Sequence, residues 1–177
     1  ILGDAISTAL KEHQIEPSPG EYLPLLSLFA GCEMEVSYVG ELDGVPVRVR
    51  PDAINHTSRY IMDLKFVKDA SPDGFAKACA NFGYTLQASN YMDVVEQVEG
   101  EPYRFLFIAV EKSAPHEFGI YELEPGDVEG VGRTARTEAL ELYRLCKARP
   151  EVFKRSYTRG IMQLALPGWV YQARKED

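Results

Sequence analysis

The sequence has 177 residues, of which 45% are hydrophobic and 26% are charged, and its formal net charge is −8. These values suit one globular domain with its own core, which we expect to cover residues 1–177. No apolar run is long enough to span a membrane and no secretory signal pattern opens the chain, so we expect neither a membrane protein nor an exported one. The net negative charge does not by itself indicate a nucleic-acid binder.

The first residue and the cysteines suggest a missing N-terminus and a reducing compartment. It begins with Ile1 rather than methionine, so we expect the native N-terminus to be missing. Cys32, Cys79 and Cys146 lie far apart, without a Cys-x-x-Cys pair. Such a set is typical of reduced thiols in the cytoplasm and argues against a disulfide framework, a zinc ribbon or an iron–sulfur cluster.

The first thirty residues read as two helices. Helical spacing predicts a helix over residues 3–13, and the proline- and glycine-containing stretch 16–21 predicts a turn. A short helix is expected over 21–31, closed by Gly31.

The apolar pattern then changes to a period of two, which is typical of strands. Strands are expected over residues 33–42, 45–54 and 59–66. Asp43-Gly44 is a strong two-residue hairpin signal, and the polar stretch 55–58 predicts a four-residue turn. These segments predict a three-stranded antiparallel meander.

The second half alternates helices and strands. Ser71-Pro72 predicts a helix start, because serine caps helices and proline favours their first position, and this helix should run to about Val98 and end at Gly100. The further elements are a central strand over 103–111, a strand over 117–124, and a helix over 126–149 stopped by Pro150. The expected class is therefore α/β, more closely an α+β arrangement with a mixed sheet flanked by helices.

The two turns set the register of the meander. They place Glu35 opposite Asp52 and Asp63 opposite Arg50, so that Asp52 and Asp63 become diagonal neighbours on one face. Lys65 follows Asp63 by two positions and stays on that face. Four ionisable groups are thus expected to converge.

Three carboxylates and one lysine leave a surplus of negative charge. Oxygen-only ligands favour Mg²⁺, with Mn²⁺ as a substitute, over zinc. The alternative is a solvated, salt-bridged sheet face. The opposite face should form core, with Val36, Tyr38, Val45, Val47, Val49, Tyr60, Met62 and Leu64.

These residues also match a known signature. Pro51-Asp52, followed eleven positions after its carboxylate by Asp63-Leu64-Lys65, resembles the PD-(D/E)xK nuclease motif. Gln87 and Tyr91, four apart on one helical face, resemble the QxxxY motif of the RecB-like subgroup. The surrounding stretches "VRVRPDAI" and "YIMDLKF", and the terminal "LALPGWV", are similar to phage recombination nucleases of the RecE (exonuclease VIII) type.

The resemblance implies a restriction-endonuclease-like core and a role for each matching residue. Asp52, Asp63 and the Leu64 carbonyl would bind the metal, and Glu35 corresponds to an upstream acid found in many members. Lys65 would orient or activate the attacking water or steady the phosphate, and Gln87 and Tyr91 would brace the site and contact the DNA backbone. The implied catalytic residues are Asp52, Asp63, Lys65, Gln87 and Tyr91.

The implied activity is a magnesium-dependent exodeoxyribonuclease that digests duplex DNA ends, with 5′-to-3′ polarity expected, during recombination. The expected setting is the cytoplasm of a bacterial or phage-infected cell. A homo-oligomer and a single-strand annealing protein are the implied partners besides DNA. One alternative is a RecB-like nuclease that acts on single strands. The other is a catalytically inactive DNA-binding module on the same fold.

DNA contacts are expected at Arg50, Tyr84, Lys154 and Arg155. Tyr84 shares the face of Gln87 and Tyr91, so both core packing and DNA contact remain open for it. Lys154 and Arg155 belong to a basic stretch that reads either as a solvated helix end or as a phosphate-contacting strip. Its basic residues are Arg144, Lys147, Arg149, Lys154, Arg155 and Arg159.

One position departs from the resemblance. RecE-like members usually carry a histidine four residues after a glycine in an early helix, where this chain has Ser7 after Gly3. His13 and His56 are nearby alternatives, although His56 falls in the turn at the far end of the second hairpin. The departure is the one feature that favours the inactive module.

Overall fold

The computed structural model describes residues 7, 11, 14–150, 161 and 163–167. By its internal contacts the chain divides into two units, Ile1–Leu140 and Glu141–Asp177. The sheet and the candidate site belong to the first unit. The helix α5 (Arg133–Ala148) runs across the division, so the single domain expected over residues 1–177 stays a prediction.

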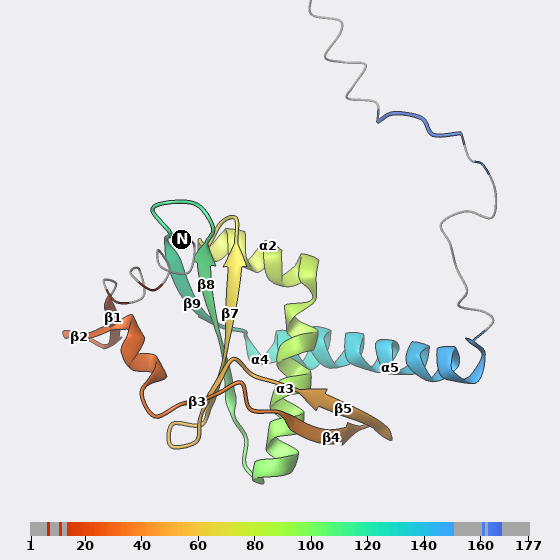
Figure 1. The fold of residues 1–177 in the computed structure, drawn as a ribbon, viewed down its shortest axis with the longest axis horizontal. Helices are drawn as coiled ribbons and strands as arrows, with labels where there is room; N and C mark the ends of the chain where they lie inside the picture. The colour runs from red at the N-terminus through yellow and green to blue at the C-terminus, as the bar shows by residue number, and fades with distance from the viewer. Residues whose placement is uncertain (1–6, 8–10, 12–13, 151–160, 162, 168–177) are drawn as a thin grey trace, which may run out of the picture. The chain divides into compact units, whose positions relative to one another are not determined.

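A five-stranded mixed sheet organises the first unit (Figure 1). Its middle is a parallel pair, β7 (Tyr60–Val67) and β8 (Arg104–Glu111), and every other neighbour is antiparallel. The remaining strands are β3 (Glu33–Met34), β6 (Ala53–Asn55) and β9 (Phe118–Glu122), in the order β3-β6-β7-β8-β9. The predicted mixed sheet flanked by helices is confirmed, with residues 104–111 as an inner strand.

The predicted meander is broken in its first two strands. Residues 38–49 leave the main sheet and form a separate hairpin of β4 (Tyr38–Leu42) and β5 (Val45–Val49). Glu35 adopts a left-handed conformation with φ of 53°, and Pro51 has no N–H for a ladder. Each breaks one of the expected strands, although the register set by Asp43-Gly44 is as predicted.

The second hairpin was predicted two residues out of register. The structure pairs Ala53 with Met62 and Asn55 with Tyr60, so the loop is 56–59 instead of 55–58. The Asn55 side chain accepts a hydrogen bond from the Ser58 N–H (2.8 Å), which favours this turn. Because the shift is even, every side chain keeps its predicted face, and the ladder projects Asp63 directly opposite Asp52.

The long helix predicted from Ser71-Pro72 is two helices, α2 (Pro72–Phe82) and α3 (Tyr84–Glu99). Its start is as predicted, since the Ser71 hydroxyl accepts a hydrogen bond from the Gly74 N–H (3.2 Å). Gly83 breaks it with a φ of 67°, and Gly100 ends α3. Phe82, the last residue of α2, and Val98, near the end of α3, are exposed.

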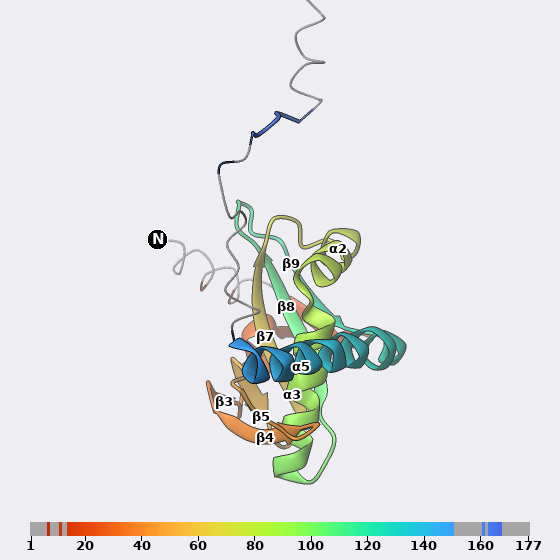
Figure 2. The same cartoon turned by 90° about the vertical axis from the view of Figure 1, so that its right-hand side faces the viewer.

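Both faces of the sheet are covered by apolar packing. One cluster includes Phe75 of α2, Val94 of α3 and Phe107 of β8. The other includes Met62 and Val110, and is covered by Leu28 and Phe29 from the 3₁₀ helix η1 (Leu25–Phe29). Figures 1 and 2 show α3 alongside the sheet, with the β4–β5 hairpin beside its C-terminal half.

The chain crosses from one cluster to the other between β5 and β6. Tyr38 and Val49 pack with Ile61, whereas Met62 faces the second cluster. The predicted grouping of Tyr38 and Val49 with Met62 and Leu64 is therefore wrong, because the break at Pro51-Asp52 reverses which face the odd-numbered residues occupy.

The remaining elements are short or lie near an end of the chain. An unexpected hairpin, β1 (Gln14–Ser18) and β2 (Glu21–Pro24), replaces the start of the second predicted helix. The helix predicted over 3–13 lies mostly outside the described residues. The last predicted helix comprises α4 (Pro125–Asp127), the π-helical turn η2 (Val128–Gly132) and α5. Within the described ranges, no helix has the length and apolar character needed to cross a membrane.

Candidate active site

The main chain beside β7 places Asp52 and Asp63 on the α3 side of the sheet. Asp63 lies inside β7 and is 5% exposed. Asp52 follows the buried Pro51, and its Oδ2 accepts a hydrogen bond of 2.7 Å from the Leu64 N–H. That bond holds the Asp52 carboxylate against the strand that carries Asp63.

The two carboxylates influence one another electrostatically. Burial is the main cause that raises the pKa of Asp63, and the negative charge of Asp52 raises it further. Hydrogen bonding and attraction from Lys65 lower the pKa but do not cancel the effect of burial. A buried carboxylate beside a second one is a place where additional positive charge is stabilising.

Lys65 supplies positive charge on the same face. Its Nζ lies 2.6 Å from the Asp63 Oδ2, and the Lys65 side chain is 16% exposed. The ammonium also lies 4.5 Å from the centroid of the Tyr84 ring and 5.9 Å from that of Phe107. Lys65 is thus held between a carboxylate and two aromatic rings.

Gln87 of α3 forms hydrogen bonds with both Asp63 and Lys65. Its Oε1 accepts a hydrogen bond of 2.7 Å from Lys65 Nζ, and its Nε2 donates to the Asp63 Oδ1. Gln87 therefore lies on the face of α3 that is turned toward Asp63 and Lys65. The amide uses both ends, so it orients the carboxylate and the ammonium together.

Tyr91 lies one turn further along α3 and contacts a different part of the site. Its hydroxyl donates to the Arg50 carbonyl at 3.5 Å, and its ring packs edge-on against Phe105. The phenol thus supports the backbone that leads into Pro51-Asp52.

Glu35 does not join the carboxylates as predicted. Its N–H donates to the Asp52 carbonyl (3.1 Å), which fits the predicted opposition of the two residues. Its side chain is exposed and lies 3.6 Å from the Arg50 guanidinium. In the described ranges no three acidic, histidine or cysteine side chains are grouped as a metal site, so the expected three-carboxylate cluster is not formed. The left-handed turn at Glu35 explains the difference.

The other sequence candidates lie elsewhere or outside the described residues. His56 is in the far turn as expected, where its Nδ1 is 2.9 Å from the Tyr103 hydroxyl. Ser7 is exposed, while His13, Lys154 and Arg155 are outside the described residues. Sequence reasoning missed Phe107, whose position directly beside Asp63 in the parallel β7–β8 pair provides an aromatic wall under Lys65.

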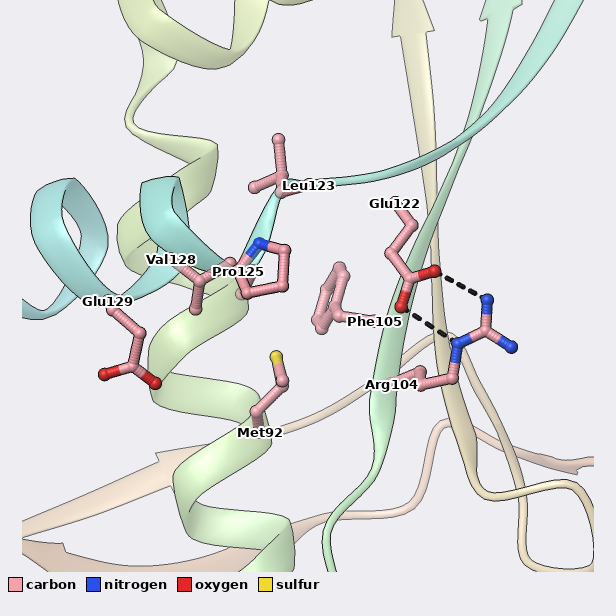
Figure 3. Close-up of a pocket in the computed structure, with 9 residues that line it drawn as sticks. Met92, Arg104, Phe105, Glu122, Leu123, Pro125, Val128 and Glu129 are labelled. Carbon is pink, nitrogen blue, oxygen red and sulfur yellow. Dashed lines mark hydrogen bonds and ion pairs between the residues drawn. The ribbon is translucent and has the colours of Figure 1, made fainter.

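A cavity of about 240 Å³ lies beside α3, away from the carboxylates. Figure 3 shows Met92, Phe105, Leu123 and Val128 around it. The rim charges Arg104 and Glu122 are paired, with Nη2–Oε2 at 2.6 Å and Nε–Oε1 at 2.9 Å. None of the residues Asp52, Asp63, Lys65 and Gln87 lines it, so this cavity is separate from the candidate site.

Comparison with solved structures supports the fold. A "Putative exonuclease" from Eubacterium rectale aligns with a TM-score of 0.69 and 15% identity over 91% of this chain. This chain spans 62% of that protein's length. A second structure, SSO0001, aligns with a TM-score of 0.42 and 16% identity, over 66% of this chain and 53% of the other, which is too weak to support an argument. No curated protein matches the sequence significantly.

The sequence matches a family described as "PDDEXK-like domain of unknown function (DUF3799)" over residues 4–156. That range contains Pro51-Asp52, Asp63-Leu64-Lys65 and Gln87. The side chains of Asp63, Lys65 and Gln87 contact one another, and the Asp52 carboxylate accepts from the Leu64 N–H. The predicted PD-(D/E)xK relationship is therefore confirmed: the chain belongs to this family of PDDEXK-like domains.

Proposed function

We propose that this chain is a metal-dependent deoxyribonuclease domain. Its active site, formed by Asp52, Asp63 and Lys65, would hydrolyse phosphodiester bonds of DNA. The observation that carries the proposal is the contact of Lys65 and Gln87 with the buried Asp63, with Asp52 fixed beside it. Membership of the PDDEXK-like family and the likeness of fold to a protein named as an exonuclease support a nuclease.

The donor set fits a hard divalent cation. Two carboxylates and the Leu64 carbonyl offer oxygen ligands, which suit Mg²⁺ and allow Mn²⁺ as a substitute. Two carboxylates against one ammonium also leave one net negative charge at a buried place. Asp52, Asp63 and Leu64 would therefore hold the ion, and Glu35 would contribute only after a change in its backbone. A bound Mg²⁺ would supply a nucleophilic water and stabilise charge on the phosphate.

The chain's own residues would position the reactants. Lys65 would donate hydrogen bonds to the attacking water or to a phosphate oxygen, because its ammonium has three donors and only two are used by Asp63 and Gln87. Gln87 would keep the ammonium and carboxylate at a fixed separation. Tyr91 would keep the Arg50–Asp52 backbone in place for the metal-binding carboxylate.

The finer proposal is an exonuclease that digests duplex ends from 5′ to 3′ in recombination, as in RecE-type enzymes. It rests on the sequence resemblance and would bring a homo-oligomer and a single-strand annealing partner with it. A RecB-like enzyme acting on single strands is the second candidate. Retention of Asp52, Asp63, Lys65 and Gln87 in contact weighs against an inactive module.

End-labelled duplex and single-stranded DNA, incubated with Mg²⁺ and then with EDTA, test the proposal. Wild-type protein should cleave with Mg²⁺ and stop in EDTA, and Asp63→Asn should lose more than about 100-fold in rate, since outer-shell residues alone cost 10–100-fold. Asp127→Asn removes the same charge from an exposed residue and should retain full activity. Cleavage by Asp63→Asn at the wild-type rate would refute the assignment.

A further inference from the structure

A second cleft, distinct from the apolar cavity, opens beside the candidate site. It has a volume of about 540 Å³ and lies between the end of β7, one side of α2 from Gly74 to Phe82, the start of α3 and the loop after β8. Its basic residues are Lys68, Lys77 and Lys112, and Asp69 is the one acidic residue among the described residues that line it. In a chain of net charge −8, this local excess of positive charge runs against the average.

The three lysines are exposed, and within the described part of the chain none forms an ion pair. A backbone hydrogen bond from the Lys112 N–H to the Val67 carbonyl (3.0 Å) brings the loop beside Lys68. The Asp69 carboxylate accepts a hydrogen bond from the Ser71 N–H at 2.9 Å, and it attracts Lys68 and Lys77 without forming an ion pair with either. The lysine ammonium groups therefore remain available to an anionic ligand.

An aromatic path joins this cleft to the candidate site. Phe82 lines the cleft, is 71% exposed and stacks on Tyr84, with ring centroids 5.8 Å apart. Tyr84 in turn stacks on Phe107 (5.6 Å) and lies under the Lys65 ammonium. Asp52, Asp63, Lys65 and Gln87 do not line the cleft, but Tyr84 is both a wall of the cleft and a contact of Lys65, so the two sites are neighbours that share Tyr84.

We propose that this cleft holds an unpaired strand of nucleic acid where it reaches Asp52, Asp63 and Lys65; the assignment of a cleavage step there rests on the proposed function. Lysines that follow a phosphate backbone, together with an exposed aromatic side chain on which a base stacks, are the features of single-strand binding surfaces. The cleft volume of about 540 Å³ falls within the range of small-ligand pockets, about 300–1,000 Å³, which suits part of one strand rather than both strands of a duplex. A duplex substrate therefore has its strands separated before one of them enters.

Fluorescence anisotropy in EDTA, where no hydrolysis occurs, measures this binding directly. The probes are a labelled oligothymidylate of about 12 nucleotides, within the usual range of single-strand sites, and a blunt duplex of the same length. Phe82→Ala should weaken oligothymidylate binding about 5- to 100-fold, the loss expected for one stacked base. Lys77→Gln and Lys112→Gln should each weaken it and reduce the slope of log affinity against log salt by about 0.7.

Matched controls separate the cleft from general charge and aromatic effects. Arg59→Gln makes the same charge change at the opposite end of β7, in a surface pair with Glu101, and Tyr22→Ala removes another exposed ring. Both should bind like the wild type. All these positions are exposed, so melting temperatures should stay close to that of the wild type.

The outcomes distinguish this inference from the proposed function. If wild type fails to cleave with Mg²⁺ but Phe82→Ala and Lys77→Gln still lose single-strand binding, the cleft is a binding site and the nuclease proposal fails. If wild type cleaves and the cleft variants bind oligothymidylate as tightly as Arg59→Gln, the cleft inference is wrong. An equal loss of affinity for blunt duplex and oligothymidylate would also overturn it, because the cleft would then not select an unpaired strand.

Discussion

Gln87 and Lys65 are joined by a hydrogen bond of 2.7 Å from the ammonium to the amide oxygen. The same amide donates through its nitrogen to Asp63, so its orientation is specified from both sides. One side chain of α3 therefore couples the acidic and the basic member of the candidate site. This makes Gln87 the residue at which positioning can be tested apart from charge.

Gln87→Ala should lower kcat about 10- to 100-fold and leave KM for DNA nearly unchanged, because it removes support for Asp63 and Lys65 without touching the substrate. Gln87→Glu should be more damaging. Its carboxylate can accept from Lys65 but cannot donate to Asp63, and its negative charge would raise the pKa of Asp63 further. The ascending limb of the kcat–pH profile should then move to higher pH. An unchanged profile in Gln87→Glu would leave Gln87 with a packing role only.

Lys65→Met should abolish cleavage while DNA binding persists, because it retains most of the side-chain volume and removes the ammonium. The variant also leaves the buried Asp63 without its nearest positive charge. The pKa of Asp63 in the folded state is already raised by burial and would rise further in the variant. A carboxyl group whose pKa is higher in the folded state than in the unfolded state destabilises the fold once the pH exceeds its unfolded-state pKa. In EDTA the variant should therefore be destabilised by about 1–3 kcal/mol at pH 7 and by less at pH 4.5.

Thermal unfolding at the two pH values, followed by circular dichroism, measures this difference. Lys147→Met, at an exposed position near the end of α5, provides the matched control and should show no such pH dependence. Equal destabilisation of Lys65→Met at both pH values would mean that Asp63 is not ionised beside Lys65.

Local signals account for the parts of the fold that the sequence predicted well. The turn at Asp43-Gly44 and the helix start at Ser71 depend on residues within four positions of each other, so their chemistry is visible in the sequence. The Asp52–Asp63 pairing survived an error of two residues in register, because side chains alternate with a period of two. The sequence therefore predicted on which face of the sheet Asp52 and Asp63 lie, but not which residues lie directly opposite each other.

The errors arise where a single backbone conformation decides the outcome. Glu35 is a non-glycine residue with positive φ, a conformation that no sequence pattern predicts. This conformation directs the Glu35 carboxylate away from the predicted cluster. Gly83 could have been tolerated inside a helix, and only the tertiary packing decides that it breaks one. The family resemblance implied only that Gln87 braces the site. Its contact with Lys65 joins residues 22 positions apart and was not predicted.

Asp93 should control part of the acid stability of the fold. It is partly buried on α3, and burial opposes its ionisation, but hydrogen bonds from Arg133 and Arg136 outweigh burial and lower its pKa. Because the folded pKa lies below the unfolded value near 3.8, the stabilisation is complete above that value and is lost as pH falls through the folded pKa. Asp93→Asn should therefore be destabilised by about 1–3 kcal/mol at pH 7. The difference from wild type should shrink below about pH 4.

Urea unfolding of wild type and Asp93→Asn between pH 3 and pH 7 would measure the effect. Glu138→Gln on α5, an exposed position, serves as the control for removing one negative charge. A gap between wild type and Asp93→Asn that stays constant down to pH 3 would contradict the role of the ion pairs.

Gly83→Ala should connect backbone strain to the candidate site. Gly83 has a φ of 67°, and its carbonyl accepts hydrogen bonds from the N–H groups of Leu86 (3.1 Å) and Gln87 (3.2 Å). A methyl group there meets nothing within 4 Å, so the cost is conformational, about 1–2 kcal/mol, which corresponds to a fall in Tm of a few degrees. Gly126→Ala is the matched control, because it too has open space and its φ lies outside the left-handed region, so its Tm should hold or rise slightly.

The two variants should also differ in activity well below their melting temperatures. Relief of the strained φ in Gly83→Ala would shift the first turn of α3, and Gln87 lies in that turn with hydrogen bonds to Asp63 and Lys65. Its kcat should fall in the direction of Gln87→Ala, whereas Gly126→Ala should keep the wild-type rate. Combining Gly83→Ala with Gln87→Ala should add little further loss of kcat, because both changes act through the same contact. Fully additive losses in the double variant would show that Gly83 acts on the site by another route.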